Sequence, residues 1–205
     1  MLPLIFSAAL VSLAGAITPG PILAVVIAKG IKSPWAGLQI ALAHIIVDIS
    51  LILFIYFGLG DALQSSPAQI VFGILGGLLV IWMGIKIFRS RNAAIQSGGS
   101  LRYNAFFLGF IVTLFNPMFL PWWLTVGSMF IMKFRPFGAA GLAALILAME
   151  IPNIVWYPLA SAAAYRSSSL KHGQKIREWL FILCGLSLVG FGVWFLVSGI
   201  QAASA

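Results

Sequence analysis

The chain has 205 residues, of which 61% are hydrophobic and only 8% are charged, and its formal net charge is +8. A water-soluble domain needs about a quarter of its residues charged to cover its surface, so this composition excludes a soluble globule and predicts a protein solvated by lipid. The twelve basic residues stand between apolar runs and not in one patch, which argues against a nucleic-acid partner.

Six apolar stretches follow one another, each close to the ~20 residues that a helix needs to cross a bilayer. A backbone exposed to lipid must satisfy its own hydrogen bonds, so such segments are helices. We therefore expect an all-α integral membrane protein, a six-helix polytopic bundle with residues 1–205 in one transmembrane domain. The predicted spans are approximately 4–28, 36–59, 68–88, 104–131, 137–163 and 179–200.

The first span contains the run Thr18-Pro19-Gly20-Pro21. Two prolines remove two backbone donors, and the glycine between them relaxes the chain further. We expect a broken helix here, with a new half-helix beginning near Pro21. The free N–H groups and positive dipole end of that half-helix would suit an anionic group such as a substrate carboxylate.

The second span carries Asp48 at its middle, with His44 one helical turn earlier on the same face. A charged side chain at this depth costs at least ~2.5–3.5 kcal/mol and usually faces a cavity or a partner. The imidazole can exchange a proton near neutral pH. His44 is therefore a candidate for proton coupling, for a metal ligand, or for an ordinary hydrogen-bonded core residue.

The fourth span contains Asn116-Pro117, followed by Pro121-Trp122-Trp123. The proline frees backbone carbonyls about one turn back, and the Asn116 side chain can bond either backbone or ligand. The sequence predicts a second broken helix with Asn116 and Pro117 near the binding site. The two tryptophans are either anchors at the membrane interface or walls of a cavity.

The fifth span carries Glu150 at its middle, with Asn153 and Tyr157 following on the same helical face. No span contains a midplane Lys or Arg to neutralise Asp48 or Glu150. Each acid must therefore take up a proton or pair with a cationic ligand. We expect Glu150, Asn153 and Tyr157 to contribute to substrate binding, and Glu150 also to proton coupling.

Lys and Arg residues set the expected orientation in the membrane. Ten of the twelve follow the first, third and fifth helices, and only Lys133 and Arg135 follow the fourth. Basic loops stay in the cytoplasm, so we expect a multi-pass cell-membrane protein with both termini extracytoplasmic. Three helices per half, with breaks in helices 1 and 4, also suggest two inverted three-helix repeats with a substrate site between them.

The motifs of soluble enzymes are missing from the sequence, namely a Ser/His/Asp set, a phosphate loop, a metalloprotease motif and a dinucleotide fingerprint. We expect neither an enzyme nor a bound cofactor.

With these residues in view, the sequence resembles the lysine-exporter / homoserine–threonine-exporter superfamily of amino-acid efflux proteins over nearly its whole length. Proline breaks of these two kinds, in the first and fourth helices of a chain of this length, are fairly specific. The resemblance rests on Thr18-Pro19-Gly20-Pro21, Lys29-Gly30, Gly37, Asp48, Gly76, Trp82-Met83-Gly84, Lys86-Ile87-Phe88-Arg89, Gly109 and Asn116-Pro117.

This resemblance implies export of amino acids or related small polar solutes, driven by the proton gradient, from a homodimer. It marks as motif residues Pro19, Gly20, Pro21, Asp48, Asn116 and Pro117. The sequence departs from the family pattern in two places, and both departures bear on the identity of the substrate more than on the fold. Ala43, His44 and Val47 stand where family members usually have glycines, and Met118 stands where many have a basic residue.

Three functions remain open from the sequence. In an amino-acid exporter, a zwitterion would offer its carboxylate to the half-helix near Pro21 and its amine to Asp48 or Glu150. In a divalent metal cation exporter, His44, Asp48 and Glu150 would be the ligands. In a membrane scaffold without transport, neutralising either acid would have no effect.

Overall fold

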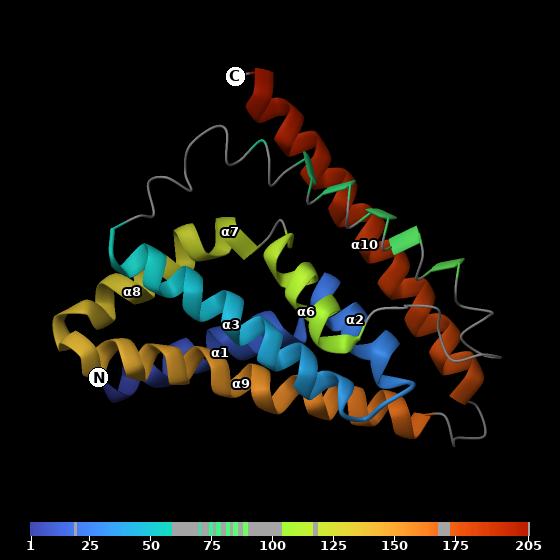
Figure 1. The fold of residues 1–205 in the computed structure, drawn as a ribbon, viewed down its shortest axis with the longest axis horizontal. Coiled ribbons are helices and arrows are strands. Elements are labelled where there is room, and N and C mark those ends of the chain that lie inside the picture. The colour runs from blue at the N-terminus through green and yellow to red at the C-terminus, as the bar shows by residue number, and fades with distance from the viewer. Residues whose placement is uncertain are drawn as a thin grey trace.

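The computed structural model describes residues 1–18, 20–58, 104–116, 119–167 and 173–204, together with residues 70, 74–75, 77–78, 81–82, 84–85 and 88–89. The described residues form helices and short turns, with no strand among them (Figure 1). The described residues are therefore helical, which confirms the predicted all-α class. By length and composition, the helix Ala36–Tyr56 and the stretch Trp123–Arg166 can each cross a membrane, and the helices Leu2–Ile17 and Pro21–Gly30 can cross as a bent pair.

The first predicted span is divided into α1 (Leu2–Ile17) and α2 (Pro21–Gly30), whose axes differ by 64°. The Thr18 hydroxyl donates to the Ala14 carbonyl at 2.7 Å and closes the end of α1. Gly20 is fully extended, with φ −160°, and starts α2. The predicted break in helix 1 is confirmed, although Pro19 itself lies outside the described residues.

The second span is one continuous helix, α3 (Ala36–Tyr56). It begins close to the fifth span, because Gly37 has no side chain to collide with the Tyr157 backbone carbonyl. The Ser161 hydroxyl donates to the Pro34 carbonyl at 2.7 Å and ties the same region together.

The fourth span is α6 (Ala105–Leu114), α7 (Phe119–Trp122), the π-helical turn η1 (Trp123–Gly127) and α8 (Ser128–Phe134). The Asn104 side chain accepts from the Phe107 N–H at 2.7 Å and caps the start of α6. The interruption between α6 and α7 confirms the predicted break in helix 4. Pro117 lies outside the described residues.

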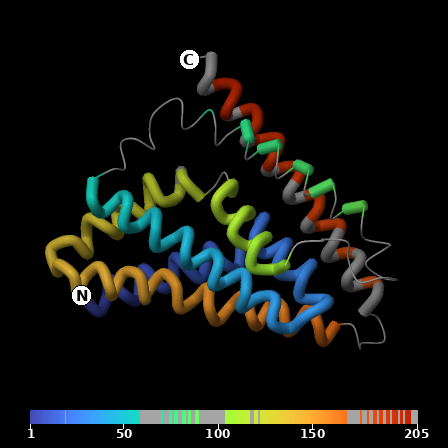
Figure 2. The backbone as a smooth tube through the Cα atoms, in the orientation of Figure 1, coloured from blue at the N-terminus to red at the C-terminus, as the bar shows by residue number. Residues whose placement is uncertain are grey.

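The chain reverses direction after α8, as the tube in Figure 2 shows. A 3₁₀ turn, η2 (Arg135–Phe137), leads into α9 (Gly138–Arg166). Gly138 has φ +57°, a conformation that favours glycine. The reversal separates α8, at the end of the fourth span, from α9.

The last helix, α10 (Gly173–Ser204), runs along one flank of the bundle beside the described positions between 70 and 89, which are helical (Figure 1). A Cβ on Gly77 would lie 2.8 Å from the Gly192 carbonyl oxygen, so the two backbones are in close contact. Most of the predicted third span, 68–88, lies outside the described residues.

Helix α9 is polar toward the protein and apolar toward the outside. Its inward face carries Glu150, Asn153 and Tyr157, each at most 4% exposed, while Leu147 and Ile151 are more than half exposed. A soluble helix shows the opposite pattern. This inverted arrangement fits a helix whose outer face meets lipid.

Two apolar clusters fill the bundle and meet at His44. One contains Phe119 and Trp123, and the other contains Tyr157. The His44 ring packs edge-on against both Phe119 and Tyr157, with ring centroids about 6 Å away. The polar residues of α3 therefore lie where the two halves of the core join.

Candidate functional site

A cavity of about 430 Å³ lies between the α1–α2 break, α3, the α6–α7 break and α9. Its volume falls within the ~300–1,000 Å³ usual for small-molecule sites. Eight residues predicted for the site line this one cavity, although they come from four separate spans. They are Thr18, Gly20, Pro21, His44, Asp48, Asn116, Asn153 and Tyr157.

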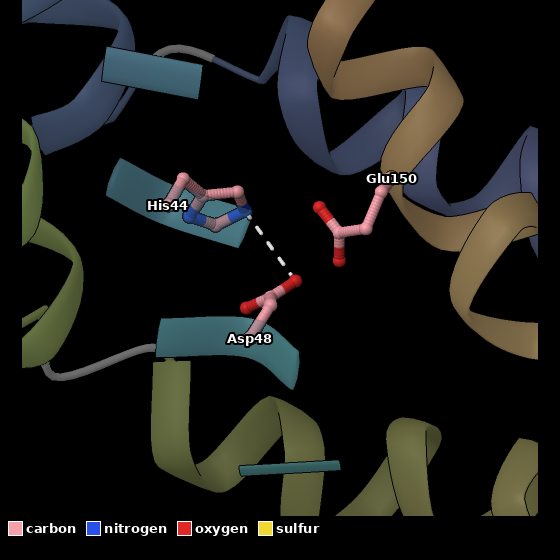
Figure 3. A group of neighbouring side chains, drawn as sticks. All are labelled: His44, Asp48 and Glu150. Atoms are coloured by element: carbon pink, nitrogen blue, oxygen red, sulfur yellow. Dashed lines mark ion pairs between the residues drawn. The ribbon is translucent and has the colours of Figure 1, made fainter. Parts of the chain in front are cut away.

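Asp48 is 4% exposed and has a partner for each carboxylate oxygen. Its Oδ1 accepts a hydrogen bond from the Trp123 indole Nε1–H at 3.2 Å. Its Oδ2 lies 3.5 Å from His44 Nε2, the pair that the helical spacing predicts (Figure 3). The other imidazole nitrogen, Nδ1, is 3.2 Å from the Thr113 hydroxyl. The carboxylate is therefore held in one orientation beside the cavity.

Glu150 comes from α9 and points toward the same pair (Figure 3). Its Oε2 accepts from the Asn153 amide at 3.4 Å, whereas its buried Oε1 has no hydrogen-bond partner within the described part of the chain. Glu150 does not line the cavity. It lies behind Asp48, with one side-chain atom from each of His44, Asp48 and Glu150 within 4.8 Å of the others.

The electrostatics of this cluster require a positive companion. Two carboxylates buried this close together repel each other and lack water to stabilise them. No Lys or Arg of the described residues pairs with Asp48 or Glu150. A proton, a substrate ammonium or a metal cation can supply the missing charge. The nitrogen and oxygen donors present suit either a proton relay or a small divalent cation.

The opposite wall of the cavity is the start of α2. Pro21 opens the helix, and Gly20 provides no side-chain cap. The N–H groups of a first helical turn have no intrahelical acceptor, and Ile22 and Leu23 of that turn line the cavity. The N-terminal end of α2 therefore borders the cavity, and the positive end of a helix dipole can stabilise an anionic group.

Aromatic side chains complete the wall, and the sequence left their role undecided. Trp122, Trp123 and Phe119 all line the cavity. Trp123 is 2% exposed and bonded to Asp48, so it is not an interface anchor. Its neighbour Trp122 packs edge-on against it, with ring centroids 5.1 Å apart. In the sequence, their position shortly after Asn116-Pro117 was the one indication that they could line the cavity.

Comparison with known proteins agrees with this architecture. The family model described as LysE type translocator matches residues 13–199. The chain is 27% identical over 188 residues to the putative amino acid efflux protein YcgF of Bacillus subtilis (strain 168), covering 89% of this chain and 90% of that one. It is 21% identical over 223 residues to the threonine efflux protein of Salmonella typhi, covering 97% and 100%.

No solved structure gives a significant match. The family match spans most of the chain, from the first broken helix to α10. The members of this family are polytopic membrane transporters and not enzymes. This chain belongs to the LysE type translocator family.

Proposed function

We propose that this protein exports an amino acid, or a related small polar solute, across the cell membrane in exchange for protons. The observation that carries the proposal is one cavity with a helix N-terminus on one wall and the Asp48 carboxylate on another. These two walls complement the two charges of a zwitterion. The efflux proteins with which the chain aligns over nine-tenths of its length support the same substrate class.

In this proposal the substrate carboxylate lies at the first turn of α2, near Pro21. The ammonium group lies at Asp48, and the amides of Asn116 and Asn153 are available from the flanking helices. Tyr157 packs against His44 and closes the site from α9. The substrate ammonium group thus supplies the positive charge that Asp48 and Glu150 need as a partner.

Proton coupling follows from competition for that negative charge. A proton and an ammonium group both neutralise the carboxylate pair, so the binding of one weakens the binding of the other. Asp48 faces the substrate and Glu150 lies behind it, with His44 within 3.5 Å of Asp48 to pass protons. A proton taken up from outside would release the substrate amine to the outside. The protonated site, without substrate, would then return to face the cytoplasm.

We further propose a homodimer with both termini outside the cell. The large apolar side chains exposed on α9 and α10, such as Leu147 and Trp179, provide surface for lipid and for a second subunit. The basic residues concentrated after helices one, three and five support this orientation. Cysteine labelling of the two termini in intact cells tests it.

The test is efflux from proteoliposomes loaded with a mixed pool of amino acids, with and without a pH gradient. We expect one amino acid or a small group of them to leave faster with the gradient, and Asp48→Asn to abolish this. Ser50→Ala is the matched control, because Ser50 lies on the exposed face of the same helix and its hydroxyl donates to the Ile46 carbonyl at 2.7 Å. Gradient-independent release, or no release from folded protein, would contradict the proposal.

A second candidate function is export of a divalent metal cation. It is favoured by one observation, the three buried ligand atoms of His44, Asp48 and Glu150 within 4.8 Å. The same vesicles loaded with Mn²⁺, Co²⁺ or Zn²⁺ and a metal-sensitive dye separate the two functions. Metal release without amino-acid release would replace the first proposal with this one.

A further inference from the structure

The fourth span contains a π-helical turn, Trp123–Gly127, between α7 and α8. Such turns insert one extra residue into a helix and occur often at functional sites. Ser128 stabilises the turn through the Trp123 carbonyl, which accepts both the Ser128 N–H and the Ser128 hydroxyl, the latter at 2.9 Å. The extra residue rotates the preceding side chains relative to those that follow.

The turn directs the Trp123 indole inward to Asp48. The indole is 2% exposed, lines the cavity and donates its only N–H to Asp48 Oδ1 at 3.2 Å. Since His44 lies beside the other oxygen, Trp123 completes the set of side chains that orient the carboxylate.

Gly127 leaves the space that this indole occupies. A Cβ on Gly127 would overlap indole atom Cε3 and lie 2.8 Å from Cδ2 and 2.9 Å from Cζ3. The backbone at Gly127 is ordinary right-handed helix, with φ −60° and ψ −45°. Its conformation therefore does not require glycine, and the free space beside Trp123 is the physical reason for one.

We propose that Gly127 and Trp123 act together as positioning residues for Asp48, so that the volume at position 127 controls substrate affinity. The inference rests on the proposed function, because it takes Asp48 as the group that receives the substrate amine. Any side chain at 127 would occupy space that the indole now fills, so the indole must move. Asp48 then loses its hydrogen-bond donor, and the cavity wall moves.

The experiment compares Gly127→Ala with two glycine controls in reconstituted protein. Gly190→Ala adds a methyl group where no atom of the described residues lies within 4 Å. Gly109→Ala creates a collision at 2.9 Å with the Ile40 backbone, away from Trp123. We expect Gly127→Ala to raise the substrate KM about tenfold, the size of losing one hydrogen bond to a charged group, with little change in maximal rate. Gly190→Ala should leave KM unchanged, and Gly109→Ala should lower the folded yield without raising KM.

A double-mutant cycle tests whether Gly127 acts through the indole. In a Trp123→Ala background no ring remains to be displaced, so Gly127→Ala should add no further increase in KM. Trp123→Phe keeps a ring but removes the donor, and should by itself raise KM as Gly127→Ala does. Independent, multiplying effects of the two substitutions would overturn the proposal.

A spectroscopic readout separates this inference from the proposed function. The indole N–H signals of the seven tryptophans can be recorded by NMR in detergent, and the Trp123 signal is the one lost in Trp123→Phe. Asp48→Asn and Gly127→Ala should both shift this signal, and Gly190→Ala should not. If the Trp123 signal shifts in these variants but the wild type transports no amino acid, the proposed function is refuted and the positioning role of Gly127 and Trp123 stands. If the wild type transports but Gly127→Ala leaves both the signal and KM unchanged, only the positioning role is refuted.

Discussion

The break between α1 and α2 presents backbone to the cavity, whereas the interruption between α6 and α8 presents side chains. At the first, the extended Gly20 and Pro21 start a helix, and Gly20, which has no side chain, lines the cavity with backbone atoms. At the second, the π turn directs the Trp123 indole to Asp48. One interruption thus forms the wall suited to an anion, and the other fixes the carboxylate suited to a cation. The following experiments test that division.

The largest effect is expected from Asp48→Asn. The amide keeps the shape and can still accept from Trp123, but it offers no charge to an ammonium group. Losing one partner of a buried charge pair costs ~2–5 kcal/mol, so we expect a fall of about 100-fold or more in transport rate at low substrate. Uptake into inverted vesicles measures this, with Ser50→Ala as control. Residual transport near the wild-type rate would show that Asp48 does not bind the amine.

Backbone donors at α2 cannot be removed by a side-chain change, so the substrate is changed instead. An amino-acid amide lacks the carboxylate that we place at the first turn of α2. A helix terminus contributes up to ~2 kcal/mol to a partly buried anion, and we expect the amide to compete about tenfold more weakly than the parent amino acid. Competition for transport measures the difference. Equal competition by both compounds would remove α2 from the binding site.

Glu150→Gln should separate coupling from binding. Glu150 lies behind Asp48 and does not line the cavity, so substrate exchange should continue with little change in KM. Two assays measure the two activities. Exchange of labelled for unlabelled substrate, at equal concentration on both sides of the membrane, reports binding and movement of the substrate. Efflux driven by a pH gradient reports coupling. We expect only the pH-driven activity to be lost. A parallel loss of exchange would show that Glu150 binds the substrate directly.

The smallest effects are expected from the hydroxyl groups that stabilise the two interruptions. Thr18 donates to the Ala14 carbonyl at the end of α1, and Ser128 donates to the Trp123 carbonyl at the π turn. Each bond contributes about 1 kcal/mol to stability, so Thr18→Val and Ser128→Ala should lower the unfolding midpoint slightly. Only Ser128→Ala should also shift the Trp123 indole NMR signal. A shift in both variants would mean that the two interruptions are coupled.

Several elements could be predicted from the sequence because their causes are local. Hydropathy predicts the spans α3 and α9, and the prolines near residues 20 and 117 predict the two breaks. The cost of an isolated charge in lipid identifies Asp48 and Glu150 as functional candidates. The i,i+4 spacing predicts the pair of His44 with Asp48, whose atoms lie 3.5 Å apart.

Other features depend on how the helices are rotated about their own axes, which local patterns do not specify. The hydrogen bond from Trp123 to Asp48 joins the fourth span to the second, and it exists because the π turn changes the direction of the indole. Helical periodicity assumes a regular 3.6-residue turn. The sequence therefore marked Trp123 as a candidate for the cavity wall but did not predict its bond to Asp48 or the space beside Gly127.

The sequence by itself determined that the chain is a helical membrane protein with two broken spans and two buried acids. Hydropathy and the missing backbone donor of proline are properties of the local sequence, so they do not depend on which helices pack together. Only the tertiary structure decided that Asp48 and Glu150 lie within 4.8 Å, that one acid faces the cavity while the other lies behind it, and that an indole orients the first. These relations arise from the packing of α3, α9 and the interrupted fourth span. Each helix rotates about its own axis until its inward side chains pack against those of the other two, and local sequence patterns do not specify that rotation.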